Sequence, residues 1–152
     1  MKLTFREIDR SNYNDCVHLT IADEQGGFVA PNMYSLVQVA YEPGLFPLGI
    51  YKDSTMVGFI LYDFDMDIPG WSMSRFMIGK DYQNQGIGKP ALRKFITYLS
   101  DKYAAKKIYT SVALTNEVAM KFYESAGFEM GEVFEYESHS KKYTERRMTL
   151  QL

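Results

Sequence analysis

Apolar and polar residues alternate at the start of the chain and then change to a helical spacing. The stretch from Leu3 to Ile8 alternates as a half-buried strand does. Apolar residues then recur every four positions from Tyr13 to Ile21, and a pair of glycines at positions 26 and 27 ends that pattern. The first part of the chain therefore predicts a strand followed by a helix.

The rest of the chain continues to switch between strand-like and helix-like segments. An acidic loop from Asp63 to Gly70 separates two of the strands. The order of elements is βααβββαβαββ, which predicts an α/β fold: a single mixed, twisted sheet of about seven strands flanked by about four helices. The further strands are expected over 48–52, 56–62, 71–78, 108–114, 128–136 and 143–150, and the further helices over 31–41, 86–103 and 116–126.

A glycine-containing turn joins the strand that ends at Ile78 to the helix that follows. The run from Tyr82 to Gly88 reads YQNQGIG. Its two glycines allow the backbone to approach an anion closely, and the free N–H groups of the helix's first turn point at that anion. Strand, turn and helix start together predict a site for a phosphate-bearing cofactor.

Two better-known phosphate loops do not fit this turn. A P-loop needs G-x-x-x-x-G-K-[ST], yet Gln83 stands where its first glycine belongs and Pro90 where its metal-binding hydroxyl belongs. A dinucleotide-binding fingerprint that starts at Gly86 lacks the acid it needs about 20 residues later. Neither of these two phosphate-loop classes therefore explains the turn.

A second motif narrows the class of cofactor-binding protein that the turn indicates. The segment from Asn116 to Phe128 resembles the N-x-x-A-x-x-Φ-Y-x-x-x-G-F block of the GNAT superfamily of acetyl-CoA-dependent N-acetyltransferases, and the loop from Tyr82 to Gly88 resembles that superfamily's Q/R-x-x-G-x-G/A loop. The resemblance covers essentially the whole chain and implies a GNAT-like fold, in which the strands ending at Ile78 and Leu114 splay apart to admit the cofactor. More narrowly, segments such as FVAPN at 28–32 and PLGIY at 47–51 resemble the bacterial spermine/spermidine (diamine) acetyltransferase group.

The resemblance implies how acetyl-CoA is bound. Backbone N–H groups across the loop would hold the coenzyme A pyrophosphate, and the strand edge before the loop would pair with the pantetheine arm and supply an oxyanion donor. The residues expected to bind the cofactor are Phe76, Met77, Ile78, Gln83, Asn84, Gln85, Gly86, Ile87, Gly88, Lys89, Asn116 and Tyr123.

The resemblance also places Tyr123 as the catalytic acid, because a phenol with a pKa of about 10 stays protonated at neutral pH and can donate to the departing thiolate. The general base stays open. Related polyamine enzymes often carry a carboxylate at the position that Ser74 occupies here. Glu24, Asp63 and Asp65 remain candidates for binding the substrate amine, and no metal ligand set is expected.

The length and composition predict a single domain over residues 1–152. Within it, the two halves of the chain carry opposite net charges. Residues 1–70 hold ten acids and four bases, whereas residues 71–152 hold nine acids and thirteen bases. An acidic half suits a cationic substrate and a basic half suits an anionic cofactor. The single cysteine, the lack of a signal peptide's apolar core and the lack of a membrane-length apolar stretch favour a cytoplasmic protein with neither a membrane nor a nucleic acid as partner.

The sequence thus predicts an acetyl-CoA-dependent N-acetyltransferase that transfers acetyl directly, in a ternary complex, to a primary amine of a small polycation such as spermidine or spermine. The alternatives are another acceptor (a peptide N-terminus, an aminoglycoside or a different metabolite) and a non-catalytic acyl-CoA sensor. The family resemblance also raises a homodimer as an expectation.

Overall fold

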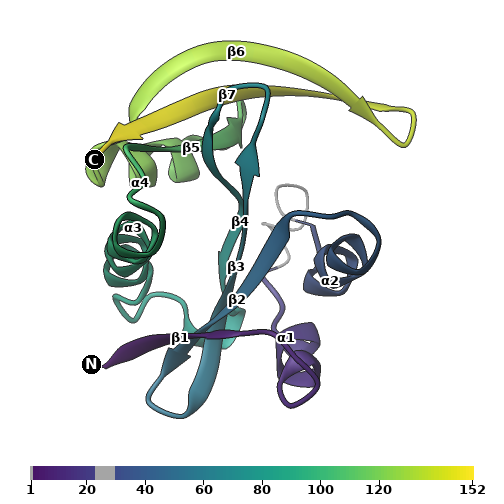
Figure 1. Ribbon diagram of the computed structural model, residues 1–152, viewed down its shortest axis with the longest axis vertical. Helices are drawn as coiled ribbons and strands as arrows, with labels where there is room; N and C mark the ends of the chain where they lie inside the picture. The colour runs from purple at the N-terminus through teal and green to yellow at the C-terminus, as the bar shows by residue number, and fades with distance from the viewer. Residues whose placement is uncertain (1, 23–29) are drawn as a thin grey trace.

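A computed structural model describes residues 2–22 and 30–152. Its centre is a seven-stranded mixed sheet in the order β1-β2-β3-β4-β5-β7-β6 (Figure 1). The expected α/β fold and element order are confirmed. The elements are β1 (Leu3–Glu7), α1 (Tyr13–His18), α2 (Asn32–Tyr41), β2 (Leu45–Lys52), β3 (Thr55–Asp65), β4 (Gly70–Ile78), the 3-10 turn η2 (Lys80–Tyr82), α3 (Gly88–Tyr103), β5 (Lys107–Ala113), α4 (Glu117–Ser125), β6 (Glu129–Ser138) and β7 (Lys141–Gln151).

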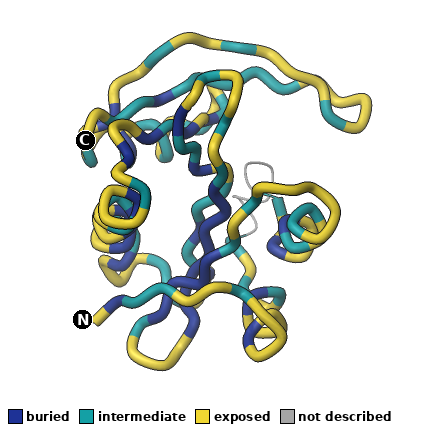
Figure 2. The backbone as a smooth tube through the Cα atoms, in the orientation of Figure 1, coloured by how far each residue is buried: buried dark blue, intermediate teal, exposed yellow. Residues whose placement is uncertain are grey.

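Helices cover the two faces of the sheet separately. On one face α3 and α4 pack their apolar sides, including Phe95 and Tyr123, against Ile60 and other strand residues. On the opposite face α1 and α2 cover a smaller cluster that contains Cys16, Phe59 and Met77. The dark, buried strands in Figure 2 run between these two helical layers. The fold therefore has two distinct sides on which ligands can approach β4.

Strands β4 and β5 separate soon after they meet. They run parallel, and their ladder contains only the pairs Trp71–Ile108 and Ser72–Tyr109. The Thr110 hydroxyl then donates a hydrogen bond of 3.0 Å to the carbonyl of Met73, which closes the apex of the gap. Beyond that point the described residues of the two strands form no further ladder pair, so the expected splay is present.

A β-bulge at Ser74 determines which β4 side chains face which side of the sheet. Leu61 pairs with Arg75, while its neighbour Tyr62 pairs with Met73, so Ser74 is the extra residue. After the bulge Phe76 packs with the α3/α4 cluster, whereas Met77 packs with the α1/α2 cluster.

Some boundaries differ from the sequence-based expectation for local reasons. The first helix ends at His18 because Leu19 is extended and the Thr20 carbonyl accepts a 2.7 Å hydrogen bond from the N–H of Lys80. Helix α3 begins at Gly88, two residues later than expected, because the φ angle of Gly86 is +73° and cannot belong to a right-handed helix. Strand β3 continues through Asp63 to Asp65, which pair with the start of β4 instead of forming a loop.

Candidate active site

The loop between η2 and α3 is built to reverse the chain tightly. Asn84 and Gly86 both have left-handed φ angles, of 61° and 73°. The side-chain amide of Gln83 donates to the carbonyl of Ile78 at 2.9 Å, and that of Gln85 donates to the carbonyl of Asp81 at 3.2 Å. These bonds fix the loop to the end of β4 and to η2, next to the gap between β4 and β5.

The first turn of α3 offers N–H donors that no side chain caps. Its N-cap residue, Ile87, is apolar and buried, and the first turn contains no acid. A Cβ atom added at Gly86 would meet nothing within 4 Å, and one at Gly88 would meet only the Phe122 ring, at 3.7 Å. The uncapped donors, the open space and the nearby Lys89 fit a phosphate group.

The apolar wall of this site comes from β4 and α4. The Phe76 ring lies 6.0 Å from the Phe122 ring, centroid to centroid. Phe76, Met77 and Ile78 form the last part of β4, where the described residues show no strand partner on the β5 side. A free strand edge of this kind can pair with an extended ligand that carries amide groups.

Tyr123 sits on α4 with only 9% of its surface exposed, packed edge-on against the Phe122 and Phe128 rings. Burial raises the pKa of Tyr123 to about 12, and the neighbouring Thr110 hydroxyl lowers this pKa by a smaller amount. Because Thr110 marks the apex of the gap, the phenol lies close to that apex. Tyr123 is therefore a protonated donor at physiological pH.

Asn116 is the N-cap residue of α4. Its side-chain oxygen accepts a 3.2 Å hydrogen bond from the N–H of Ala119. At the other end Gly127, with a φ angle of +100°, stops the helix. These two residues set the length of α4 and hence the position of Tyr123.

Replacing Asn116 with alanine is expected to lower the free energy of unfolding by about 1 kcal/mol, because the N–H of Ala119 loses its acceptor. Urea unfolding of the two proteins measures this. Serine at position 116 is the matched control, since it keeps a capping oxygen and removes only the amide. Equal stability of the alanine variant and the parent would contradict the capping role. Any cofactor contact of Asn116 stays a prediction, to be read from coenzyme A affinity in the serine variant.

Of the acidic residues proposed for substrate binding, Asp63 and Asp65 lie on β3, away from the phosphate loop. Asp63 pairs with Ser72 and Asp65 with Gly70, at the end of β4 opposite the phosphate loop. From Ser72 to Ile78 the strand spans about 20 Å. The Asp63 carboxylate accepts a 2.9 Å hydrogen bond from the Ser74 hydroxyl, and burial raises the pKa of Asp63. Glu24 lies outside the described residues, and the role of all three stays a prediction.

Two charged residues that the sequence did not single out as site residues lie on β4 and β7, on either side of β5. Arg75 of β4 donates a 2.9 Å hydrogen bond to the side-chain oxygen of Gln38 on α2. Glu145 of β7 accepts hydrogen bonds from the Ser111 and Tyr136 hydroxyls. The alternation along β7 could have placed Glu145 on this face, but not beside β5, because that depends on β7 lying between β5 and β6.

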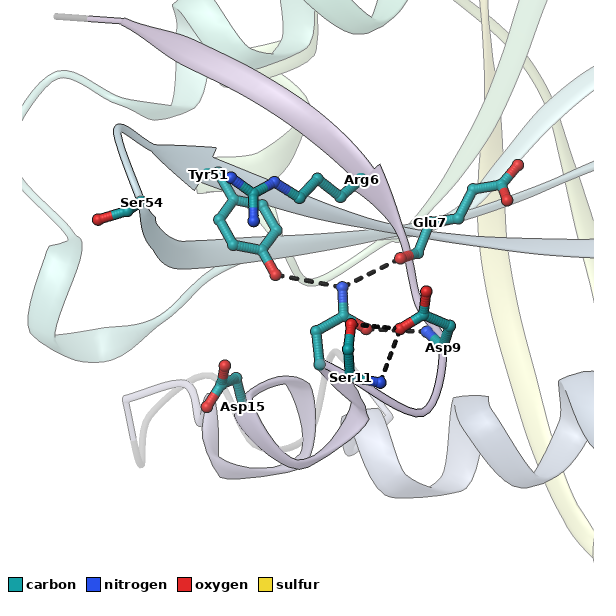
Figure 3. A pocket seen from close by; sticks show the side chains of 8 residues that line it. Arg6, Glu7, Asp9, Ser11, Asp15, Tyr51 and Ser54 are labelled. Carbon is teal, nitrogen blue, oxygen red and sulfur yellow. Dashed lines mark hydrogen bonds between the residues drawn. The ribbon is translucent and has the colours of Figure 1, made fainter.

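A separate polar pocket lies on the outer strands. Its residues include Arg6, Glu7 and Tyr51 (Figure 3). The side-chain amide of Asn12, which precedes α1, donates to the Tyr51 hydroxyl at 3.1 Å and to the carbonyl of Glu7 at 3.0 Å. The Arg6 guanidinium stacks over the Tyr51 ring at 4.3 Å. Since β3 separates this pocket from β4, it forms no part of the site around Tyr123.

The described residues contain neither a helix long and apolar enough to cross a membrane nor a cluster of three or more side chains suited to a metal ion.

The loop, the free strand edge and the buried Tyr123 phenol lie around the gap between β4 and β5. The chain matches the model of the Acetyltransferase (GNAT) family over residues 9–128. It therefore belongs to this family, whose members use acetyl-CoA.

Individual proteins resemble this chain either in sequence over part of its length or in fold over nearly all of it. The spermine/spermidine N(1)-acetyltransferase of Bacillus subtilis (strain 168) is 34% identical over 90 residues, which span 55% of this chain and 59% of that protein. The crystal structure of spermidine N-acetyltransferase from Vibrio cholerae in complex with CoA and spermine has a TM-score of 0.74 at 17% identity, covering 98% of this chain and 95% of the other. The ribosomal-protein-S18-alanine N-acetyltransferase from Escherichia coli is as similar in fold, with a TM-score of 0.73 at 17% identity over 99% and 94% of the two chains. The fold is thus common to enzymes whose names indicate different acceptors.

Proposed function

We propose that this protein transfers the acetyl group of acetyl-CoA directly to a primary amine of a small polycation, with spermidine and spermine as the leading acceptors. The observation that carries the proposal is the convergence of the uncapped start of α3, the unpaired end of β4 and the Tyr123 phenol around one gap in the sheet. The named relative in Bacillus subtilis supports the polyamine class, although the match spans about three fifths of its length.

Bound acetyl-CoA supplies an activated acyl thioester. The N–H groups around Gly86 and Gly88 would hold its diphosphate, and the edge of β4 at Met77 and Ile78 would align the pantetheine arm. A backbone N–H on that edge would stabilise the developing oxyanion. Tyr123 would donate its proton to the departing thiolate, which its high pKa permits because the phenol is uncharged at neutral pH.

The acceptor is expected on the α1/α2 side of β4. Met77 points to that side and lines an apolar hollow together with residues of α1 and α2, among them Val17, Pro31 and Met33. An apolar hollow accommodates the methylene chain of an aliphatic amine. Attack from this side would leave the thiolate facing Tyr123.

An acetylation assay tests the proposal. The protein is incubated with acetyl-CoA and with spermidine, spermine, an aminoglycoside, a peptide with a free N-terminus and single amino acids, and coenzyme A release is followed. We expect the highest kcat/KM for the polyamines. A higher value for any of the other acceptors would reject the polyamine assignment, and coenzyme A binding without any product would favour a sensor.

The pH dependence of the reaction follows from two pKa values. An alkyl amine with a pKa of about 10.4 must lose a proton before attack. Tyr123, with its pKa raised to about 12, stays protonated below that value. We expect kcat/KM for the amine to rise about tenfold per pH unit from pH 7 towards about 10 and to show no fall attributable to Tyr123 below about 11. A descending limb centred near pH 9 would contradict the assignment of the buried phenol as the acid.

A further inference from the structure

Glu145 is a carboxylate held in place by two hydroxyl groups. One carboxylate oxygen accepts a 2.8 Å hydrogen bond from Ser111 on β5, and the other accepts a 3.2 Å hydrogen bond from Tyr136 on β6. The residue is partly buried on β7. Each oxygen keeps a further lone pair, so the carboxylate is oriented and still able to accept from a ligand.

No cationic side chain of the described residues pairs with Glu145. The two ion pairs of residues 2–22 and 30–152 join Lys142 to Glu135 and Arg147 to Glu132. The nearby guanidinium of Arg75 is bonded to Gln38 instead, although Glu145 is close enough to raise the pKa of Arg75 against the lowering effect of burial. The carboxylate therefore has no ion-pair partner within 4 Å among these residues, and the Arg75 guanidinium is the cation that acts on it from a greater distance.

Glu145 lies beside β5 beyond the point where β4 and β5 separate. On β5 its ladder partner is Ala113, four residues beyond Tyr109, the last residue that pairs with β4. The same count along β4, four or five residues beyond Ser72, reaches Phe76 and Met77. One strand, β5, separates β7 from the gap, which corresponds to a spacing of about 5 Å. The carboxylate is thus about one strand width from the gap in which the thioester is expected.

The same face is partly enclosed by aromatic side chains. Tyr136 and Tyr143 stack with ring centroids 5.2 Å apart beside Glu145. At the hairpin tip the His139 ring nitrogen lies 3.0 Å from the Tyr34 hydroxyl of α2, so the β6–β7 hairpin and α2 meet on this side of the sheet. Aromatic rings beside a carboxylate favour an alkylammonium group.

We propose that Glu145 binds the second, non-reacting ammonium group of the acceptor and so selects diamines and polyamines over monoamines. This inference rests on the proposed acetyl transfer to an amine. A carboxylate beside the attacking nitrogen would raise the pKa of that nitrogen and keep it protonated. Held about one strand width away, the carboxylate instead fixes the far end of the molecule and leaves the reacting nitrogen free to lose its proton.

The surrounding charges favour a cation despite Arg75. Both Glu42 and Glu145 interact electrostatically with the Arg75 guanidinium. Asp63 also lies near Arg75. Three carboxylates against one arginine leave a net negative field on this face.

The test compares Glu145→Gln with the parent protein on two acceptors, spermidine and the monoamine n-butylamine. Glutamine keeps the size of the side chain and an oxygen for one hydroxyl while removing the charge. We expect the spermidine-over-butylamine ratio of kcat/KM to fall about tenfold or more, mainly through the KM of spermidine, with the butylamine value little changed. Glu135→Gln is the matched control, because it removes an equal charge from the same hairpin at a residue paired with Lys142.

The outcomes separate this inference from the function on which it depends. A parent protein that acetylates neither amine overturns the proposed function and the inference with it. A parent that prefers spermidine, together with a Glu145→Gln variant that keeps the full preference, overturns the role of Glu145 alone. Calorimetric titration of spermidine into the coenzyme A-bound proteins gives an independent readout: weaker binding only in the Glu145→Gln variant supports the role, and unchanged binding overturns it. Glu145→Asp, which retains the charge, is expected to keep part of the preference even if the glutamine variant folds poorly.

Discussion

Replacing Tyr123 with phenylalanine is expected to lower kcat about 100- to 10,000-fold, the range that a positioned general acid contributes. The departing thiolate would then have to take its proton from water, and the buried site admits little water. Phenylalanine preserves the packing against Phe122 and Phe128. The affinity for coenzyme A and the melting temperature should therefore change little.

Steady-state kinetics with saturating acetyl-CoA, together with a coenzyme A titration, measure this effect. Tyr51→Phe is the matched control, because it removes another buried phenolic hydroxyl, hydrogen-bonded to Asn12 on the outer strands, and should leave kcat near the parent value. If Tyr123→Phe retains more than about a tenth of the parent kcat, the phenol is not the acid.

Replacing Gly88 with aspartate is expected to weaken coenzyme A binding about 100-fold or more while leaving the fold intact. A carboxylate at the first residue of α3 would compete with the diphosphate for the same N–H groups and repel it, and a like-charge contact of this kind costs several kcal/mol. The helix itself should gain slightly, because an acid is favourable at a helix N-terminus. The added Cβ has room beside Phe122, at 3.7 Å.

Isothermal titration with coenzyme A and thermal unfolding of the same samples separate these two effects. Gly88→Ala is the control, since it adds the Cβ without the charge and should bind coenzyme A much as the parent does. An aspartate variant that is as stable as the parent and binds as tightly would show that the diphosphate does not lie at the start of α3.

The sequence predicted most of the fold because its strongest signals are local. Alternating strands, glycine-limited helices and the cap at Asn116 all depend on residues a few positions apart. The boundaries that differed depend on distant contacts instead. Helix α1 is short because the carbonyl of Thr20 bonds to Lys80, and β3 is long because Phe64 packs against Trp71, with ring centroids 5.3 Å apart. Neither partner can be inferred from periodicity.

Those parts of the candidate site that one continuous segment of the chain forms could be predicted from the sequence. The loop from Gln83 to Gly88 and the helix that carries Tyr123 are such segments. Arg75 and Glu145 were not assigned to the site because their proximity depends on three strands, β4, β5 and β7, that meet only in the folded sheet. The bulge at Ser74 is a further case, since it results from the pairing register with β3 and leaves no mark in the sequence.

A crystal structure with coenzyme A bound tests the central claim most directly. We expect the diphosphate on the backbone N–H groups between Gln85 and Lys89, the pantetheine arm along the end of β4, and the sulfur about 3 to 4 Å from the Tyr123 hydroxyl. A diphosphate bound away from the start of α3, or a sulfur on the far side of β4 from that hydroxyl, would contradict the account.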